Sequence, residues 1–303
     1  MFHENAAEFG IPYDGPPTVR RERVEVGDGR ALSALVWGES DPEFVFLHGG
    51  AQNAHTWDTV LLALGRPALA IDLPGHGHSD GGRAGYLDIG DNAADVAVVV
   101  RQLAPRAKAV VGMSLGGATA LGLAGVASDL VRRLVLVDIT PGVTSQKASA
   151  ITNFVNGPES FPDFDSILAR TVEHNPTRSA SSLRRGILHN AEQRQDGTWV
   201  WRYARHRSLL AQEGAGLAQE GAPPGSAGAV HFDGLWDVVS GLKVPVMLVR
   251  GMLPQSVVDD ADEAELLRRQ PKAVVKHVAN AGHSVQGDAP VELAALIREF
   301  AGG

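Results

Sequence analysis

Two copies of the pattern G-x-S-x-G are the first feature of this sequence that could do chemistry. The serine of this pattern can serve as a nucleophile where a strand ends just before it and a helix begins just after it. Ser114 meets this condition, because the apolar run Ala107–Val111 precedes it and the small-residue run Gly117–Val126 follows it. Ser79 does not, since GHSDG is followed by GRAG. We therefore predict that Ser114 is the nucleophile.

The residues that flank Ser114 fit a sharp turn between a strand and a helix. Gly112 and Gly116 leave room for a strained backbone and for close packing of the helix. A helix that begins here directs its free N–H groups and the positive end of its dipole at the serine. We expect the Leu115 N–H to stabilise an oxyanion that forms at this site.

A competing chemistry comes from the spacing His76-x-His78-x-Asp80, which is typical of a metallo-hydrolase ligand set. Gly81 stands where such a set would place another histidine, and we find no second His/Asp cluster of the right kind. A serine hydrolase also explains the order of strands and helices, whereas a metal site does not. We predict no metal and no cofactor.

Strand and helix patterns alternate on both sides of these motifs. Predicted strands are Arg23–Val26, Ala31–Trp37, Glu43–Leu47, Ala68–Ile71, Ala107–Val111, Arg133–Val137, Val244–Val249 and Ala273–Val278. Predicted helices are Thr56–Leu64, capped by Thr56 or Asp58, then Ile89–Leu103, Gly117–Val126, Asp262–Arg269 and Pro290–Phe300. Continuous Val/Ile/Leu strands in β-α-β order predict an α/β fold with a mostly parallel eight-stranded sheet and helices on both faces.

The alternation stops between residues 142 and 242, which we interpret as an inserted helical cap. The segment includes the Gly-rich, flexible-looking stretch Gly214–Gly228. The hydrolase core would then comprise 21–141 and 243–303, with 1–20 as an N-terminal arm. The alternative is a helical subdomain that does not contact the active site, although ligand sites favour such domain interfaces.

Composition narrows the possible functions. A chain of 303 residues with 44% hydrophobic content can bury a substantial core. Its net charge of -8 opposes binding to nucleic acid or to an anionic membrane. The absence of cysteine removes thiol nucleophiles, disulfides and cysteine-ligated metals. We find no leader sequence and no apolar run long enough to span a bilayer, so we expect a cytoplasmic protein.

Four motifs together resemble those of the α/β-hydrolase superfamily. In order they are His48-Gly49-Gly50, the loop DLPGHGHS at 72–79, GMSLGG around Ser114, and Ala281-Gly282-His283-Ser284. The resemblance extends from about residue 20 to the end of the chain. It implies a serine-nucleophile, esterase-like enzyme.

The resemblance also assigns roles to the first two motifs. It implies that the Gly50 N–H completes an oxyanion hole with Leu115, with Ala51 as the next choice, and that His48 braces the loop. The DLPGHGHS loop would border the pocket without supplying the nucleophile. Ser79, His76 and His78 would then be structural.

His283 is the predicted general base, because it lies in the loop between the last strand and the last helix. The acid is expected after the seventh strand in many members, but Arg250–Ser256 contains no carboxylate. Some members instead use the end of the sixth strand, which implies Asp138, with Asp259 or Asp260 as alternatives. Asp138 could otherwise cap the start of the insertion through backbone N–H groups.

We therefore expect a Ser114–His283–Asp138 hydrolase that cleaves a small carboxylic ester or lactone through an acyl-enzyme. An aspartate nucleophile is disfavoured because Ser114 occupies the turn. A carbon–carbon bond hydrolase is the alternative, and a catalytically silent binding protein is a third possibility. The carbon–carbon reaction would need further polar groups, for which the candidates are Asn53, Arg184, Arg185 and Arg202. The substrate itself and the oligomeric state are left open.

Overall fold

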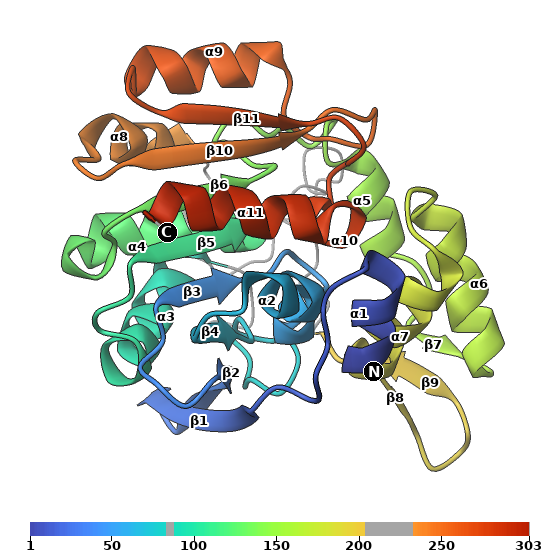
Figure 1. Cartoon of the computed structure of the whole chain (residues 1–303). Helices are drawn as coiled ribbons and strands as arrows, with labels where there is room; N and C mark the ends of the chain where they lie inside the picture. Colours follow the sequence, from blue (N-terminus) through green and yellow to red (C-terminus); the bar gives the residue numbers. More distant parts are fainter. Residues whose placement is uncertain (83–87, 204–232, 303) are drawn as a thin grey trace, which may run out of the picture.

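The computed structural model describes residues 1–82, 88–203 and 233–302. Its centre is an eight-stranded sheet in the order β1-β2-β4-β3-β5-β6-β10-β11 (Figure 1). The strands are β1 Val19–Gly27, β2 Arg30–Trp37, β3 Phe44–Leu47, β4 Ala68–Ile71, β5 Ala109–Met113, β6 Leu134–Val137, β10 Val246–Gly251 and β11 Val274–Val278. The strand β2 is antiparallel to both of its neighbours, and all the other pairs are parallel. The predicted fold class is confirmed.

Helices cover both faces of the sheet, and each face has its own apolar core. One face packs against α2 Asp58–Leu64 and α11 Pro290–Ala301, where Trp57, Leu61 and Ile297 are buried. The other packs against α3 Ile89–Leu103, α4 Leu115–Val126, α8 Asp233–Gly241 and α9 Asp260–Arg269. Short helices complete the layers, namely η1 Ala54–Trp57, η2 Ser128–Leu130 and α10 Val285–Asp288.

The parallel register aligns the carboxyl ends of four strands. Met113 pairs with Val137, Val137 with Val249, and Gly251 with Val278. The loops that follow β5, β6, β10 and β11 therefore leave the sheet at one edge, where ligand sites of open α/β sheets lie. Ser114, Asp138 and His283 all belong to these loops.

The inserted segment contains a small sheet as well as helices. Its described elements are α5 Ser149–Val155, β7 Ser160–Phe161, α6 Phe164–His174, α7 Ala180–Asn190, β8 Ala191–Gln193 and β9 Trp199–Trp201. The three strands form an antiparallel sheet, and buried Phe161, Ile167 and Ile187 form a separate small core beneath it. The segment was predicted as an inserted helical cap, and it contains these short strands in addition to its helices. Gly214–Gly228 lies outside the described residues.

The boundaries proposed for the cap, 142–242, also enclose α8. This helix contacts α4 and α9, and its Leu235 and Val239 join the core on that face of the sheet. The cap elements proper therefore end before α8 among the described residues.

The N-terminal arm forms more structure than the sequence suggests. Residues Phe2–Phe9 form α1, which ends at Gly10 in a left-handed conformation, and β1 begins within the arm at Val19. Phe2 packs edge-on against Trp37 of β2, with ring centroids 5.2 Å apart. The helix also contacts α2, and Figure 1 shows it beside the cap helix α7.

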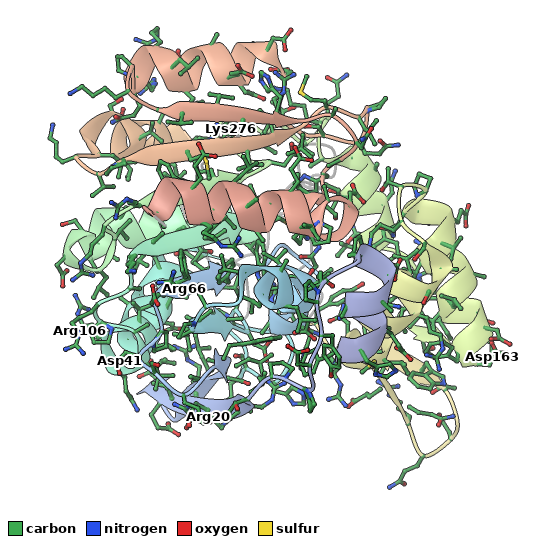
Figure 2. All side chains as sticks on the ribbon, in the orientation of Figure 1. Arg20, Asp41, Arg66, Arg106, Asp163 and Lys276 are labelled. Carbon is green, nitrogen blue, oxygen red and sulfur yellow. The ribbon has the colours of Figure 1, made fainter. Side chains whose placement is uncertain are left out.

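Charged side chains lie around the outside of this fold. Figure 2 labels Arg20, Asp41, Arg66, Arg106, Asp163 and Lys276 at its periphery. Arg106 pairs with Asp41, and Arg66 pairs with Glu43 at 2.6 Å. Within the described parts of the chain, no helix combines the length and the apolar character that a membrane crossing requires.

Candidate active site

Ser114 occupies a sharp turn between β5 and α4. Its backbone has φ 50° and ψ −118°, a strained conformation for a residue with a side chain. Glycines make the turn possible: a Cβ on Gly112 would lie 2.3 Å from the Gly116 carbonyl oxygen, and one on Gly116 would lie 2.2 Å from the Leu47 carbonyl oxygen. The backbone of α4 thus packs directly on β5 and on the end of β3. This is the strand–turn–helix geometry expected of a nucleophile.

Asp138 and His283 are brought together at the same edge of the sheet. The Oδ2 atom of Asp138 lies 2.9 Å from Nδ1 of His283. Asp138 is fully buried and His283 is 9% exposed. An ionised aspartate can only accept, so this contact places the imidazole proton on Nδ1 and leaves Nε2 as a proton acceptor.

The Asp138 carboxylate is held by three further donors, one at the end of β10 and two in the loop that follows it. Oδ1 accepts hydrogen bonds from Gly251 N at 3.0 Å and from Ser256 Oγ at 2.6 Å, and Oδ2 accepts one from Val257 N at 3.1 Å. The loop that lacks a carboxylate therefore supplies the donors that orient the carboxylate of Asp138. The backbone N–H groups come from this loop and not from the insertion.

The alternative acids lie elsewhere. Asp259 caps α9, accepting from Asp262 N at 3.0 Å, and pairs with Lys147 at 2.7 Å. Asp260 is exposed and pairs with Arg250. The Lys147 ammonium lowers the pKa of Asp259 to about 2. Neither carboxylate contacts His283.

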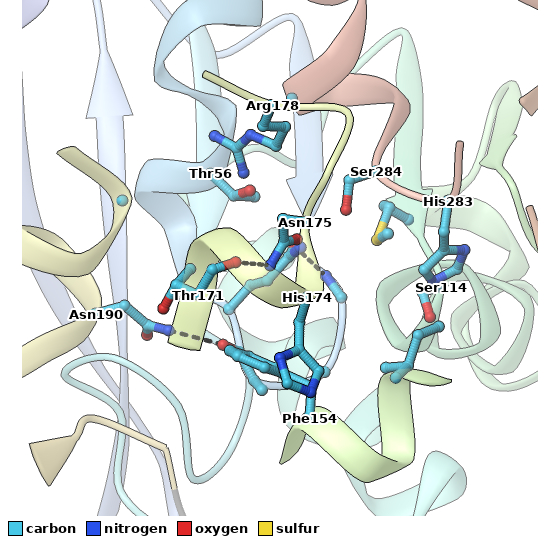
Figure 3. A pocket seen from close by; sticks show the side chains of 18 of the residues that line it. Thr56, Ser114, Phe154, Thr171, His174, Asn175, Arg178, Asn190, His283 and Ser284 are labelled. Carbon is cyan, nitrogen blue, oxygen red and sulfur yellow. Dashed lines mark hydrogen bonds between the residues drawn. The ribbon is translucent and has the colours of Figure 1, made fainter. Parts of the chain in front are cut away.

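Ser114 and His283 line one cavity of about 820 Å³. Its walls come from the core and from the cap, with Thr171, Arg178 and Asn190 among the cap residues. Figure 3 shows the side chains of Ser114 and His283 at the same side of this cavity. A cap without contact to the site, the alternative considered above, does not describe this structure.

The backbone of the HGG loop lies against Ser114. A Cβ on Gly49 would be 2.5 Å from Met113 Sδ and 3.4 Å from Ser114 Cβ. The Ala51 N–H donates to His76 Nε2 at 3.2 Å, which removes it as an oxyanion donor. No described residue accepts a hydrogen bond from the Gly50 N–H. Gly50 and the first N–H of α4, at Leu115, are thus the donors available beside the serine.

The DLPGHGHS loop is fixed by hydrogen bonds. Ser79 Oγ donates to the Asp72 carbonyl oxygen at 2.6 Å and accepts from Ser33 N at 2.8 Å. Asp80 pairs with Arg23, while His76 Nδ1 contacts the Pro74 carbonyl oxygen. His76 and Asp80 of the H-x-H-x-D motif therefore have separate partners. Among the described residues, the histidine and carboxylate groups that lie close enough to share a metal do not include this motif.

His48 is a buried brace. Its Nδ1 lies 2.7 Å from the Gly49 carbonyl oxygen, and its Nε2 accepts from Leu73 N at 2.9 Å. Burial lowers the pKa of this imidazole, so it stays neutral. It links the HGG loop to the DLPGHGHS loop.

A different histidine–aspartate cluster is present, which was not predicted from the sequence. The ligand atoms of His55, Asp58 and His189 lie within 4.8 Å of one another in the cavity wall. These are possible ligands for a transition metal. However, Arg21 Nη2 lies 3.1 Å from His55 Nε2 and can only donate, so the His55 proton is on Nδ1, directed at Asp58. A metal at Nδ1 would have to displace this proton beside a fixed positive charge.

The polar groups considered for a carbon–carbon bond hydrolase have unequal positions. Asn53 lines the cavity and donates to Asn190 Oδ1, while Asn190 Nδ2 donates to the Ala51 carbonyl oxygen at 2.7 Å (Figure 3). Arg185 lines the cavity but is bound by Glu8. Arg184 is exposed, and Arg202 pairs with Glu192. Neither of these two lines the cavity.

Comparison with known proteins agrees with this geometry. A model of the alpha/beta hydrolase family matches residues 44–296. The chain belongs to this family, as the resemblance predicted.

Two relatives cover most of the chain. Esterase Rv0045c of Mycobacterium tuberculosis is 44% identical over 98% of this chain and 93% of its own length. A solved structure of that esterase, from work on its inhibition by transition metals, has a TM-score of 0.79 at 43% identity and covers 98% of this chain and 96% of its own. The 2-(acetamidomethylene)succinate hydrolase of Mesorhizobium japonicum is 29% identical over 83% of this chain and 84% of its own length.

Proposed function

We propose that this protein is an esterase that hydrolyses small carboxylic esters or lactones through Ser114, His283 and Asp138. The observation that carries the proposal is the hydrogen bond from His283 to buried Asp138, at the edge of the sheet where Ser114 occupies its strained turn. The 44% identity to a named esterase supports the ester as the reacting group.

In this mechanism Nε2 of His283 removes the Ser114 proton as Oγ attacks the ester carbonyl. The Gly50 and Leu115 N–H groups donate to the resulting oxyanion. The intermediate collapses, the C–O bond to the alcohol breaks, and His283 returns its proton to the departing oxygen. A water molecule then loses a proton to His283 and attacks the acyl carbon. As the bond from this carbon to Ser114 Oγ breaks, His283 returns the proton to Oγ, which releases the carboxylic acid and regenerates Ser114.

The alternatives have less support. A carbon–carbon bond hydrolase would use the same triad with added polar groups from the cap, but Arg184 and Arg202 do not line the cavity and Arg185 is neutralised by Glu8. A catalytically silent binding protein would not need a buried aspartate oriented by three donors toward a histidine.

The test is hydrolysis of 4-nitrophenyl esters of graded acyl length by the protein and by Ser114→Ala. We expect turnover with the former and a loss of at least about 10³-fold with the latter. Equal turnover in both would disprove the proposal. A carbon–carbon hydrolase substrate, assayed in parallel, decides between the ester and the alternative.

A further inference from the structure

Arg178 places a cation in the wall of the cavity without a partner of opposite charge. It lies between α6 and α7 and lines the same cavity as Ser114 and His283. Its Nε atom is buried and has no hydrogen-bond partner, and its Nη2 donates to Ser182 Oγ at 2.7 Å. No carboxylate of the described residues lies within 4.0 Å of this guanidinium. The side chain as a whole is partly buried, and its Nε atom is removed from water. A guanidinium in such a position usually has an anionic partner, since removing its charge from water is costly.

The neighbouring arginine shows the contrast. Arg185, on α7, is 5% exposed and donates to Glu8, to Asn5 and to Ser181. Its charge is matched within the protein. Arg178 has only the neutral Ser182 hydroxyl, although both side chains line one cavity.

The two acids whose charges act on Arg178 already have other partners. Glu8 accepts from Arg185 and Ser179. Asp288 accepts from Thr177 Oγ1 at 2.9 Å and from Gly282 N at 2.8 Å. Burial lowers the pKa of Arg178, and the charges of Asp288 and Glu8 act in the opposite direction. An arginine remains protonated under such conditions, so the unmatched group is a cation.

The guanidinium lies beside the catalytic loop. A Cβ on Gly287 would be 2.9 Å from Arg178 Cζ and Nε, so the cation packs against the backbone of α10. The residue at the N-cap position of that helix is Ser284, which directly follows His283. Figure 3 labels Arg178, Ser114 and His283 among the side chains that line the cavity. Ser114 and Arg178 line the same cavity of about 820 Å³, so a molecule that fills this cavity shares it with both residues.

We propose that Arg178 determines specificity by binding a free carboxylate on the ester substrate. The inference rests on the proposed ester hydrolysis at Ser114 and adds a substrate class to it, namely esters that also carry a carboxylic acid. A guanidinium presents a planar fork of donors that matches a carboxylate. A phosphate would share this chemistry, but the charges of Asp288 and Glu8 oppose its second negative charge and favour the monoanion.

The experiment compares matched pairs of esters that differ in one charge. The 4-nitrophenyl half-esters of succinate, glutarate and adipate are assayed beside the same compounds with the free acid converted to a methyl ester. For the wild-type protein we expect kcat/KM to favour the free acid at the optimal length by about 10- to 100-fold, as for a hydrogen bond to a charged group. A second set of esters carries the carboxylate, or a phosphate, on the alcohol part instead of the acyl part. Comparison of the two sets identifies the part of the ester and the anion that Arg178 binds.

Variants then test the residue. Arg178→Ala should abolish the preference while changing kcat/KM for the methyl-capped ester less than threefold, and Arg178→Lys should restore part of it. The matched control is Arg184→Ala, an exposed arginine on α7 that should leave the preference intact. Glutarate should raise the melting temperature of wild-type protein but not of Arg178→Ala.

Two results would overturn the inference. One is a wild-type protein that hydrolyses capped and free-acid esters equally well in both sets. The other is an Arg178→Ala variant that loses both activities in proportion, which would mean that Arg178 only holds the cap in place. The proposed function fails separately, if no ester is hydrolysed and Ser114 forms no acyl-enzyme. If Arg178→Ala does not fold, the wild-type preference and the Arg178→Lys variant still decide.

Discussion

Asp138 and His283 are separated by 145 positions in the sequence, yet Oδ2 of Asp138 lies 2.9 Å from Nδ1 of His283 and orients its imidazole. Replacement by asparagine would place an amide N–H or oxygen where a carboxylate oxygen stands and would favour the wrong imidazole tautomer. We expect Asp138→Asn to lower kcat by up to about 10⁴-fold. Steady-state kinetics on an ester substrate would measure this.

The matched control for that substitution is Asp259→Asn, because Asp259 follows the same sheet edge but caps α9. It should leave kcat nearly unchanged, because an asparagine at this position still accepts from Asp262 N and caps α9. Only the ion pair with Lys147 is lost, at a cost of about 0–1 kcal/mol in stability. The opposite pattern, with normal turnover in Asp138→Asn, would move the acid to the loop after β10.

Covalent labelling tests the nucleophile directly. An activated serine reacts with an organophosphonate, so we expect one adduct per chain, located at Ser114 by peptide mapping. Ser79 should stay unlabelled, because its hydroxyl donates to the Asp72 carbonyl oxygen. Labelling that persists in Ser114→Ala would refute the assignment.

The glycines around Ser114 predict a sharp difference between two alanine substitutions. Gly112→Ala would put a methyl group 2.3 Å from the Gly116 carbonyl oxygen, so the turn could not form without backbone movement. We expect a loss of about 3 kcal/mol or more in the free energy of unfolding, with loss of activity. Gly125→Ala on the same helix meets nothing closer than Val238 at 3.5 Å and should stabilise by about 0.5–1 kcal/mol. Urea denaturation of both variants would compare them.

The cavity wall predicts a dependence of stability on pH. Burial beside His55 lowers the pKa of His189 from 6.5 to about 3. The unfolded chain therefore binds a proton that the folded chain does not, between pH 6.5 and 3, and stability falls as the pH falls through that window. From this residue alone we expect a loss of about 2 kcal/mol between pH 8 and 5.

His189→Gln should remove that part of the pH dependence, measured as urea midpoints at several pH values. His48, whose pKa is also lowered by burial, would account for a remaining slope of the same sign. The control is His3→Gln, since the His3 side chain is 68% exposed. An unchanged slope in His189→Gln would mean that this imidazole is solvated.

Chelation should leave ester hydrolysis unchanged, because every step of the proposed mechanism is assigned to a side chain or backbone group. Kinetics before and after dialysis against EDTA would measure this. Activity that is lost and then restored by zinc would direct attention to His55, Asp58 and His189, the cluster that the structure assembles.

The strands and helices of the core could be predicted because their signals are local. Continuous apolar runs and the glycines at 112 and 116 specify the sheet and the turn at Ser114 without knowledge of the rest of the fold. The position of Asp138 next to His283 required the family resemblance, since nothing local distinguishes it from Asp259.

What escaped prediction depends on contacts between distant segments. The lack of an anionic partner for Arg178 cannot be predicted from the sequence, because it depends on the hydrogen bonds that Gly282 N and Thr177 Oγ1 donate to the Asp288 carboxylate. His189 joins His55 and Asp58 through the docking of the cap. The helix α1 was missed because its stability comes from Phe2 on Trp37 and from its contacts with the cap, rather than from its own periodicity.

The position of α1 has a practical consequence for anyone who produces this protein. Asn5 lines the cavity and accepts a hydrogen bond from Arg185. Glu8 accepts hydrogen bonds from Arg185 and Ser179. This helix therefore links the core to the cap beside the cavity that contains Ser114. The C-terminal helix α11 instead ends on the opposite side of the molecule, away from the cap (Figure 1). An affinity tag or an immobilisation linker should therefore be attached after α11. Additions or deletions near α1 would alter the cavity, and with it the substrate preference that the ester assays measure.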